Sequence, residues 1–186
     1  MILGEKLRSL LTGDESVPLD GAALEVAQIE YPMLHPAPWL GVLDRHAQEI
    51  DLRAGTGADG ATFLQTAHEY LFEELGFRGN QQDYYSPLNS CLNHVLDTRQ
   101  GIPISLSIVY MEIARRLGRE VRGVSLPGHF LMLFRQDAFA VYLDATFHPL
   151  LQELDFHQEG FRFDFDDAHR CAGTHHNRPS VTRAKE

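Results

Sequence analysis

The stretch RQGIPISLSIVYMEIARRLG, residues 99–118, decides how the rest of the chain is interpreted. Gly101 opens a turn, and Pro103 stands where a helix would begin, a position that proline favours. Apolar residues then follow on nearly every side, which is typical of a buried helix. Ser105 and Ser107 are the only polar side chains in its first half. The segment therefore predicts a central helix in the core of the protein.

Amphipathic helices and a loop are expected before this central helix. Apolar residues recur there three or four positions apart, as on one face of a helix. The predicted helices cover residues 2–11, 20–30, 35–54 and 58–75. Asp20 is the expected N-cap of the second, and Gly55 closes the third. Residues 77–90 are expected to form a loop, with a short helix starting at Pro87.

The pattern changes after Gly118 from helical to alternating. Short runs of β-branched and aromatic residues, broken by turn residues, predict three antiparallel strands. These runs cover residues 119–126, 129–134 and 139–145. Residues 161–165 alternate in the same way and are a candidate fourth strand.

The expected fold class is therefore α+β, with a buried central helix packed on a small antiparallel sheet. An N-terminal helical region would cover residues 1–80, and the core would cover residues 81–166. Residues 167–186 are polar and are predicted to be an unstructured tail. We expect the chain to form a single domain overall, since 186 residues is an ordinary size for one.

Charge and composition exclude several classes of partner. The chain carries 26 acidic and 16 basic residues, a formal net charge of −10. Nucleic acids and anionic membranes are bound by basic surfaces, so neither is an expected partner. No run approaches the ~20 apolar residues that span a bilayer, and the first residues do not resemble a secretory signal. With two cysteines far apart in sequence, a cytoplasmic location is expected.

Two further patterns are set aside. Residues 55–60, GTGADG, match a dinucleotide-binding fingerprint, but that motif needs a buried strand before it, and here an amphipathic helix precedes it. A cluster of potential metal ligands lies near the C-terminus, at His157, His169, Cys171, His175 and His176. Its spacing matches no structural zinc site. We therefore predict no cofactor and no metal ion.

His129 and Asp144 are the candidate site residues that follow the central helix. His129 begins the second predicted strand, and Asp144 lies at the end of the third. Adjacent antiparallel strands would bring the two side chains together. A carboxylate on one imidazole nitrogen fixes the tautomer and leaves the other nitrogen free as a base. A structural hydrogen bond between two strands explains the same spacing, and the sequence leaves both interpretations open.

Three blocks of the sequence resemble a known family. They are EYPMLHPAPWLGVLDRHA, FRGNQQDYYSPLNSCLNHVLDTRQGIPISLSIVYMEIARRLG and VSLPGHFLMLF. Together they resemble the transglutaminase-like superfamily, and within it the bacterial SirB-type branch, which is named for a link to invasion-gene regulation. The resemblance covers about residues 20–152 and implies a papain-like fold.

The resemblance also implies a catalytic triad that this chain does not complete. Members of the superfamily carry a Cys at the N-terminus of the central helix, a His on one strand and an Asp on the next. The histidine corresponds to His129 and the aspartate to Asp144. The cysteine position falls on Pro103, which has no nucleophile.

Other side chains are candidates to replace the missing thiol. Ser107 lies one helical turn after Pro103 and on the same side. Ser105 points almost to the opposite side. Each serine has a structural alternative, a hydrogen bond back to a carbonyl of the preceding turn. Cys91 lies on the preceding helix. We expect it to be a small buried apolar residue rather than a displaced nucleophile.

Three functional hypotheses follow. The first is a non-catalytic or regulatory binding module with a vestigial His–Asp site and a protein or peptide partner. The second is an unorthodox hydrolase or acyltransferase, in which Ser107, Ser105 or a cysteine attacks and His129 takes the proton, held by Asp144. The third is a metal binder, which ranks last because His129 and Asp144 alone are too few ligands. The sequence leaves open whether the chain is an enzyme.

Overall fold

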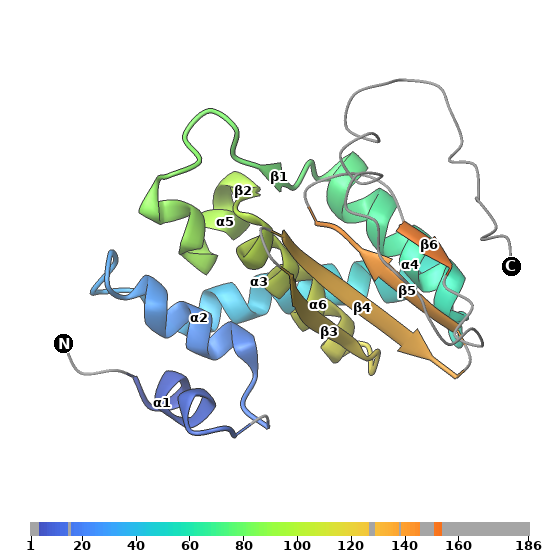
Figure 1. Cartoon of the computed structure of the whole chain (residues 1–186), viewed down its shortest axis with the longest axis horizontal. Coiled ribbons are helices and arrows are strands. Elements are labelled where there is room, and N and C mark those ends of the chain that lie inside the picture. Colours follow the sequence, from blue (N-terminus) through green and yellow to red (C-terminus); the bar gives the residue numbers. More distant parts are fainter. Residues whose placement is uncertain (1–3, 15, 127–128, 138, 146–150, 154–186) are drawn as a thin grey trace, which may run out of the picture. The chain divides into compact units, whose positions relative to one another are not determined.

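The computed structural model describes residues 4–14, 16–126, 129–137, 139–145 and 151–153, with backbone only for Leu126, His129 and residues 151–153. All of them belong to the first of two units of the chain, Met1–Asp155. The α-helices are α1 (Glu5–Leu11), α2 (Leu19–Ala27), α3 (Pro36–Ala54), α4 (Gly60–His68), α5 (Leu92–Thr98) and α6 (Pro103–Arg116) (Figure 1). The main strands are β3 (Val121–Leu126), β4 (His129–Gln136), β5 (Phe139–Leu143) and β6 (Leu151–Glu153).

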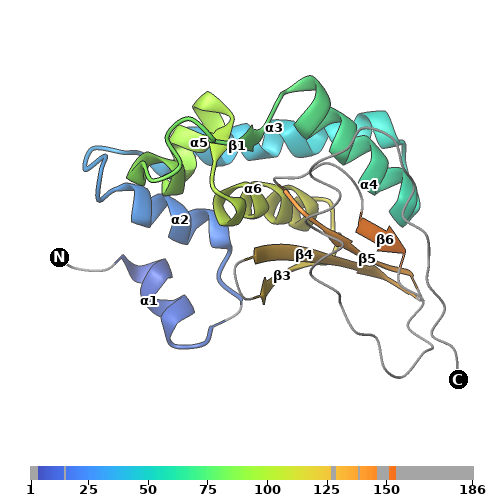
Figure 2. The same cartoon turned by 45° about the horizontal axis from the view of Figure 1, so that its top comes forward.

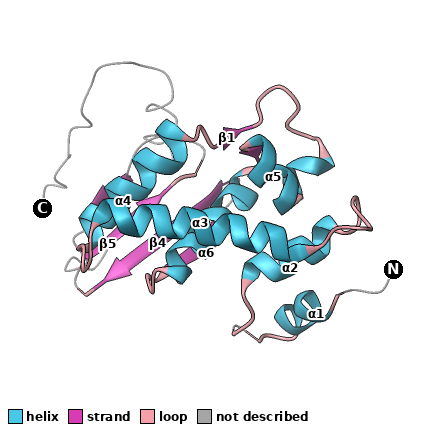
Figure 3. Cartoon of the chain, turned by 180° about the vertical axis from the view of Figure 1, so that it is seen from behind, coloured by secondary structure: helices cyan, strands magenta, loops and turns pink. Residues whose placement is uncertain are grey.

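The central helix α6 begins at Pro103, as the sequence predicts, with Ile102 as its N-cap. It packs against β3 and β4 on one side and against α3 on another. Figure 2 shows α6 between the sheet and α3. In Figure 3, which views the chain from the opposite side to Figure 1, α3 crosses in front of α6. Val109, Ile113 and Ala114 are at most 2% exposed, which confirms the predicted burial of this helix.

The sheet has the strand order β3-β4-β5-β6, and each described pair is antiparallel. The three strands predicted from the alternating runs are therefore confirmed. The fourth strand is β6, whereas the predicted strand at residues 161–165 lies outside the described residues, as does the tail at 167–186. Met132 and Phe134 of β4 are fully buried and belong to the same core as α6.

The helix predicted over residues 58–75 changes its geometry partway. After α4, residues Glu69–Glu74 form a π-helical segment, η1, and the amide of Leu75 donates to the carbonyl of Tyr70 at 2.9 Å, five residues back. Three consecutive residues of this segment are buried: Tyr70, Leu71 and Phe72. π-Helical turns are rare and often lie beside functional sites.

The segment before α6 also differs from the prediction. The expected loop contains β1 (Arg78–Gly79), which pairs in parallel with β2 (Gln100–Gly101). The helix expected from Pro87 is a short 3₁₀ turn, η2 (Pro87–Ser90), followed by α5. Cys91 separates the two with extended backbone angles, φ −88° and ψ 109°.

Asp20 is not the N-cap of α2, because Pro18 takes that position and Asp20 lies inside the first turn. Its side chain is buried and pairs with Arg116 of α6, whose Nη2 lies 2.7 Å from Asp20 Oδ2. Glu112, near the C-terminal end of α6, is only 2% exposed. It accepts from the amide of Leu19 at 2.9 Å and from Nε of Arg115 at 2.8 Å. The Asp20–Arg116 ion pair and the hydrogen bond from Leu19 to Glu112 connect α2 to α6.

The environment of Glu112 changes its proton affinity. Burial, followed by the negative charge of Asp20, raises the pKa of Glu112 above its ordinary value of 4.5. Arg115 acts in the opposite direction but does not cancel these effects. None of the helices in the described part of the chain is long and apolar enough to cross a membrane.

Candidate functional site

The antiparallel hairpin of β4 and β5 places the backbones of His129 and Asp144 at one edge of the sheet. His129 is the first residue of β4 and pairs with Leu126. Met132 pairs with Leu143, the last residue of β5, and Asp144 follows directly. The side chain of His129 lies outside the described part of the structure, so its contact with Asp144 stays a prediction.

Asp144 lies on the wall of a small cavity between α4, α6 and the sheet. The lining residues are Leu64, His68, Phe72, Tyr110, Met132, Leu143 and Asp144. The cavity volume is about 10 Å³, which is room for roughly one water molecule. A peptide does not fit into a space of this size.

His68 also lines this cavity, and it is not among the site residues predicted from the sequence. It is the last residue of α4, and its ring centroid lies 5.2 Å from that of Phe72. Leu64, His68 and Phe72 follow one another at intervals of four, so they share a helix face. That spacing was the available signal, and it places a second histidine beside the cavity that Asp144 lines.

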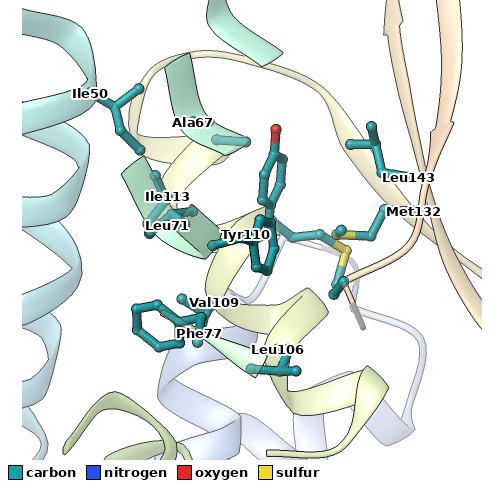
Figure 4. Packing of buried hydrophobic residues seen from close by; sticks show 14 of the residues in the cluster. Ile50, Ala67, Leu71, Phe77, Leu106, Val109, Tyr110, Ile113, Met132 and Leu143 are labelled. Carbon is teal, nitrogen blue, oxygen red and sulfur yellow. The ribbon is translucent and has the colours of Figure 1, made fainter. Parts of the chain in front are cut away.

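Tyr110 reaches the same cavity from the middle of α6. Its ring stacks on that of Phe72, with centroids 6.2 Å apart and planes at 10°. Figure 4 shows this ring between Ala67 on one side and Met132 and Leu143 on the other. Burial raises the pKa of the Tyr110 phenol well above its ordinary value, so the hydroxyl stays protonated.

Pro103 occupies the first position of α6, where the resemblance implies a nucleophile, and it supplies no reactive group. The hydroxyl of Ser105 accepts from the amide of Ile102 at 3.1 Å and donates to the carbonyl of Asn89 at 2.7 Å. It also lies 3.0 Å from the carbonyl oxygen of Ile102. Ser105 therefore caps the helix and ties it to the η2 turn.

Ser107 lies deeper in the protein than Ser105. Its relative exposure is 0%, and its Oγ has no hydrogen-bond partner among the residues that the structure describes. An unpartnered buried hydroxyl is uncommon and calls for an explanation. Two properties follow for this serine: its hydroxyl is not engaged in capping, and it is sealed from solvent.

Cys91 is 3% exposed and occupies the N-cap position of α5. Burial, followed by the negative charge of Glu30, raises the pKa of its thiol. The Sγ atom lies 3.7 Å from the carbonyl oxygen of Pro87. A buried thiol with a raised pKa is a poor nucleophile.

Two asparagines hold the loop that leads to α6. Asn80 Nδ2 donates to Asn89 Oδ1 at 3.0 Å, and Asn89 Nδ2 donates to the carbonyl of Asp83 at 2.7 Å. Asn89 is 1% exposed, and its own carbonyl accepts from Ser105. The two side-chain amides therefore stabilise the loop. The backbone carbonyl of Asn89 connects the loop to the N-terminus of α6 through Ser105.

The described residues contain no group of three or more His, Cys, Asp or Glu side chains that could hold a metal ion. The histidines considered near the C-terminus, together with Cys171, lie outside those residues.

A central helix on an antiparallel sheet, with the backbones of His129 and Asp144 at one end of it, agrees with the papain-like α+β fold that the resemblance implies. Residues 37–164 match the family model described as the transglutaminase-like superfamily. The chain belongs to the transglutaminase-like superfamily.

Relatives come from bacteria and from mammals. A UPF0162 protein of Xylella fastidiosa is 37% identical over 131 residues, which cover 70% of this chain and 47% of that protein. A UPF0162 protein of Pseudomonas aeruginosa is 35% identical over 111 residues, 60% of this chain and 41% of that protein. The human F-box only protein 21 is 43% identical over 81 residues, 44% of this chain and 13% of that protein.

The chain spans about half the length of the first bacterial relatives it matches. No solved structure matches it significantly.

Proposed function

We propose that this protein is a non-catalytic binding or regulatory module that keeps a transglutaminase-like fold and a vestigial His–Asp site. One observation carries the proposal: the first position of α6 is Pro103, which has no nucleophilic side chain. Thiol chemistry in this fold depends on a cysteine at a helix N-terminus, where free amides and the helix dipole stabilise the thiolate.

The environments of the other candidate nucleophiles support the same conclusion. Ser105 is engaged in capping α6, with its hydroxyl between Ile102 and Asn89. Ser107 is inaccessible to solvent, and Cys91 is buried with a raised pKa. Each of these groups would need a rearrangement of the core before it could attack a substrate.

The relatives fit a protein module. The segment similar to the human F-box only protein 21 makes up 13% of that protein, so the unit is one part of a much longer chain there. The three sequence blocks resemble the bacterial SirB-type branch, and a link to regulation is the role that this resemblance implies. A protein or peptide partner is the expected ligand.

Charge and cysteine usage bear on the partner and the location. The net charge of −10 disfavours nucleic acid and anionic membranes. Cys91 is a free, buried thiol. A free thiol is compatible with the reducing cytoplasm, which is the location we propose.

Ester and thioester hydrolysis by the wild-type protein and by His129→Ala tests the absence of catalysis. We expect p-nitrophenyl acetate and a peptide thioester to be hydrolysed no faster in the presence of either protein than in buffer alone. Circular dichroism on both proteins controls for folding, and His129→Gln serves if the alanine variant unfolds. Turnover by the wild type that disappears in a folded His129 variant would contradict the proposal.

An unorthodox hydrolase or acyltransferase is the alternative, and the unpartnered Ser107 hydroxyl favours it. In that reaction Ser107 Oγ would attack a substrate carbonyl while His129 takes its proton and Asp144 orients the imidazole. His129 would then give that proton to the leaving group as its bond to the carbonyl carbon breaks, which forms the acyl-serine. A water molecule deprotonated by His129 would attack the acyl-serine, and the proton would return to Ser107 Oγ as the acid is released. Ser107→Ala would abolish this activity, whereas Ser105→Ala would preserve it in a folded protein.

A further inference from the structure

An open groove lies between the loop that follows α2, the start of α3 and one face of α5. The same elements lie side by side in Figure 1, away from β5. Its volume is about 580 Å³, within the range of about 300–1,000 Å³ typical of ligand sites. It shares no lining residue with the cavity at Asp144. The groove is therefore a separate candidate site.

The loop that forms one wall is held by its own hydrogen bonds. The amide of Tyr31 donates to the carbonyl of Ala27 at 2.9 Å, and the amide of Leu34 donates to the carbonyl of Tyr31 at 2.9 Å. Nε2 of Gln28 donates to the carbonyl of Leu34 at 3.1 Å. A wall that is formed in advance lowers the ordering cost of binding.

Apolar side chains line part of the groove. Trp39 is half-buried at its side, and Met33 is 84% exposed. An exposed methionine is an adaptable apolar contact, because its side chain is flexible and polarizable. Together, Trp39 and Met33 provide a surface for an apolar side chain of a ligand.

Asn93 supplies a polar group without a partner. It lines the groove from α5 and is 5% exposed. Its Oδ1 has no hydrogen-bond partner among the residues that the structure describes. A buried amide oxygen without a donor is destabilising, and an N–H group of a ligand would satisfy it.

The charged residues of the groove are acidic. Glu30 and Asp97 line it with exposed side chains, and none of its described lining residues is a lysine or an arginine. Asp97 follows Asn93 by four residues on α5, so the two share a helix face. A cationic group is therefore favoured at this rim, and an acidic ligand is disfavoured.

We propose that this groove binds an extended peptide segment of a partner protein in which a basic side chain neighbours an apolar one. The basic side chain lies toward Glu30 and Asp97, and the apolar side chain packs on Trp39 and Met33. A backbone N–H of the peptide donates to Asn93 Oδ1. This site is independent of the His129–Asp144 edge, so it goes beyond the proposed loss of catalysis.

The groove carries its own reporter, since Trp39 is the only tryptophan in the chain. The probes are blocked hexapeptides that pair lysine or arginine with leucine, phenylalanine or isoleucine in either order. We expect a saturable change in tryptophan emission with members of this panel. Matched panels in which glutamate replaces the basic residue, or serine the apolar one, should bind at least about tenfold more weakly.

Variants of exposed residues assign the binding to the groove. Glu30→Gln combined with Asp97→Asn should weaken the best peptide about fivefold, because each exposed ion pair contributes well under a factor of ten. Asp51→Asn is the matched control, since Asp51 is exposed on α3 and does not line the groove. Asn93→Leu should weaken binding further, provided that its circular dichroism matches the wild type.

Several results would overturn the proposal. One is the absence of any emission change up to about 1 mM peptide. Another is equal affinity for the acidic panel, and a third is unchanged affinity in the Glu30→Gln, Asp97→Asn double variant. Because both carboxylates are exposed, that variant keeps the proposal testable even if Asn93→Leu does not fold.

Discussion

The hydroxyl of Ser105 donates to the backbone carbonyl of Asn89 at 2.7 Å and joins the N-terminus of α6 to the loop before it. Asn89 in turn holds that loop through its side-chain amide. Ser105, two residues after Pro103, is thus part of the framework. Its hydroxyl stabilises the end of the helix at which the resemblance implies a catalytic thiol.

Ser105→Ala should lower the free energy of unfolding by about 1–3 kcal/mol, because it leaves the amide of Ile102 and the carbonyl of Asn89 without their partner. Ser107→Ala is the matched control on the same helix, since its Oγ has no hydrogen bond within the described structure. Urea denaturation of both variants measures the difference. A larger loss for Ser107→Ala would contradict the assignment of roles.

Gly101→Ala should destabilise the protein by about 1–3 kcal/mol. A β-carbon at this position would lie 2.6 Å from Ser105 Oγ and 3.0 Å from a methyl group of Val95. Gly41→Ala on α3 is the control, because there the nearest atom is 3.7 Å away. That substitution should instead raise stability by roughly 0.5–1 kcal/mol, as alanine favours a helix. Thermal melts of the two variants should shift in opposite directions.

Pro103→Cys should restore a reactive thiol at the start of α6. The position is half-buried rather than sealed, and the free amides of the helix N-terminus lower the pKa of a thiol there. We expect iodoacetamide at pH 7 to modify the introduced thiol at least about tenfold faster than Cys91, which burial protects. Peptide mapping by mass spectrometry measures both rates in one sample. Slower modification than at Cys91 would show that this helix end is closed.

Arg116→Ala should lower the free energy of unfolding by about 3–5 kcal/mol, because it leaves the buried carboxylate of Asp20 without its nearest partner and removes one of the two arginines that contact Glu112. The Arg116 side chain is only 13% exposed. Arg122→Ala is the control: its partner is Glu120, and the Arg122 side chain is 75% exposed, so little stability should be lost. Equal effects of the two variants in guanidinium titrations would contradict this account of the α2–α6 contact.

Glu112→Gln should change how stability depends on pH. The folded-state pKa of Glu112 is raised above 4.5, so its contribution is full below pH 4.5 and is lost as the pH rises through the raised value. The stability of the wild type relative to Glu112→Gln should therefore fall as the pH increases from 4.5. Unfolding titrations at several pH values test this, with the exposed Glu120→Gln as a control. A relative stability that rises with pH would contradict the direction.

The main elements could be predicted because their apolar patterns are long. The helix from Pro103 and the three strands after Gly118 each bury a continuous set of side chains, and burial sets the period of the sequence. By contrast, β1 and β2 have two residues each and leave no pattern. The π-helical segment after His68 differs from an α-helix only in hydrogen bonding, so the sequence does not distinguish it.

The candidate site could be predicted only in part. The backbones of His129 and Asp144 lie at the same end of neighbouring strands, as a hairpin of adjacent strands predicts. The buried charges could not be found in this way, because Asp20 and Arg116 are 96 residues apart in the chain and each belongs to a helix end that normally faces solvent. His68 was missed because the cavity that it lines is formed only when separate elements pack together.

The most direct test of the central claim is the intact mass of the wild-type protein after incubation with a fluorophosphonate and then with iodoacetamide. We predict no fluorophosphonate adduct on Ser105 or Ser107 and only slow alkylation of Cys91, because no described candidate is both accessible and activated. The contradicting result is a stoichiometric fluorophosphonate adduct on Ser107 that disappears in a folded His129→Ala variant. That outcome would establish a serine nucleophile and an active His–Asp pair.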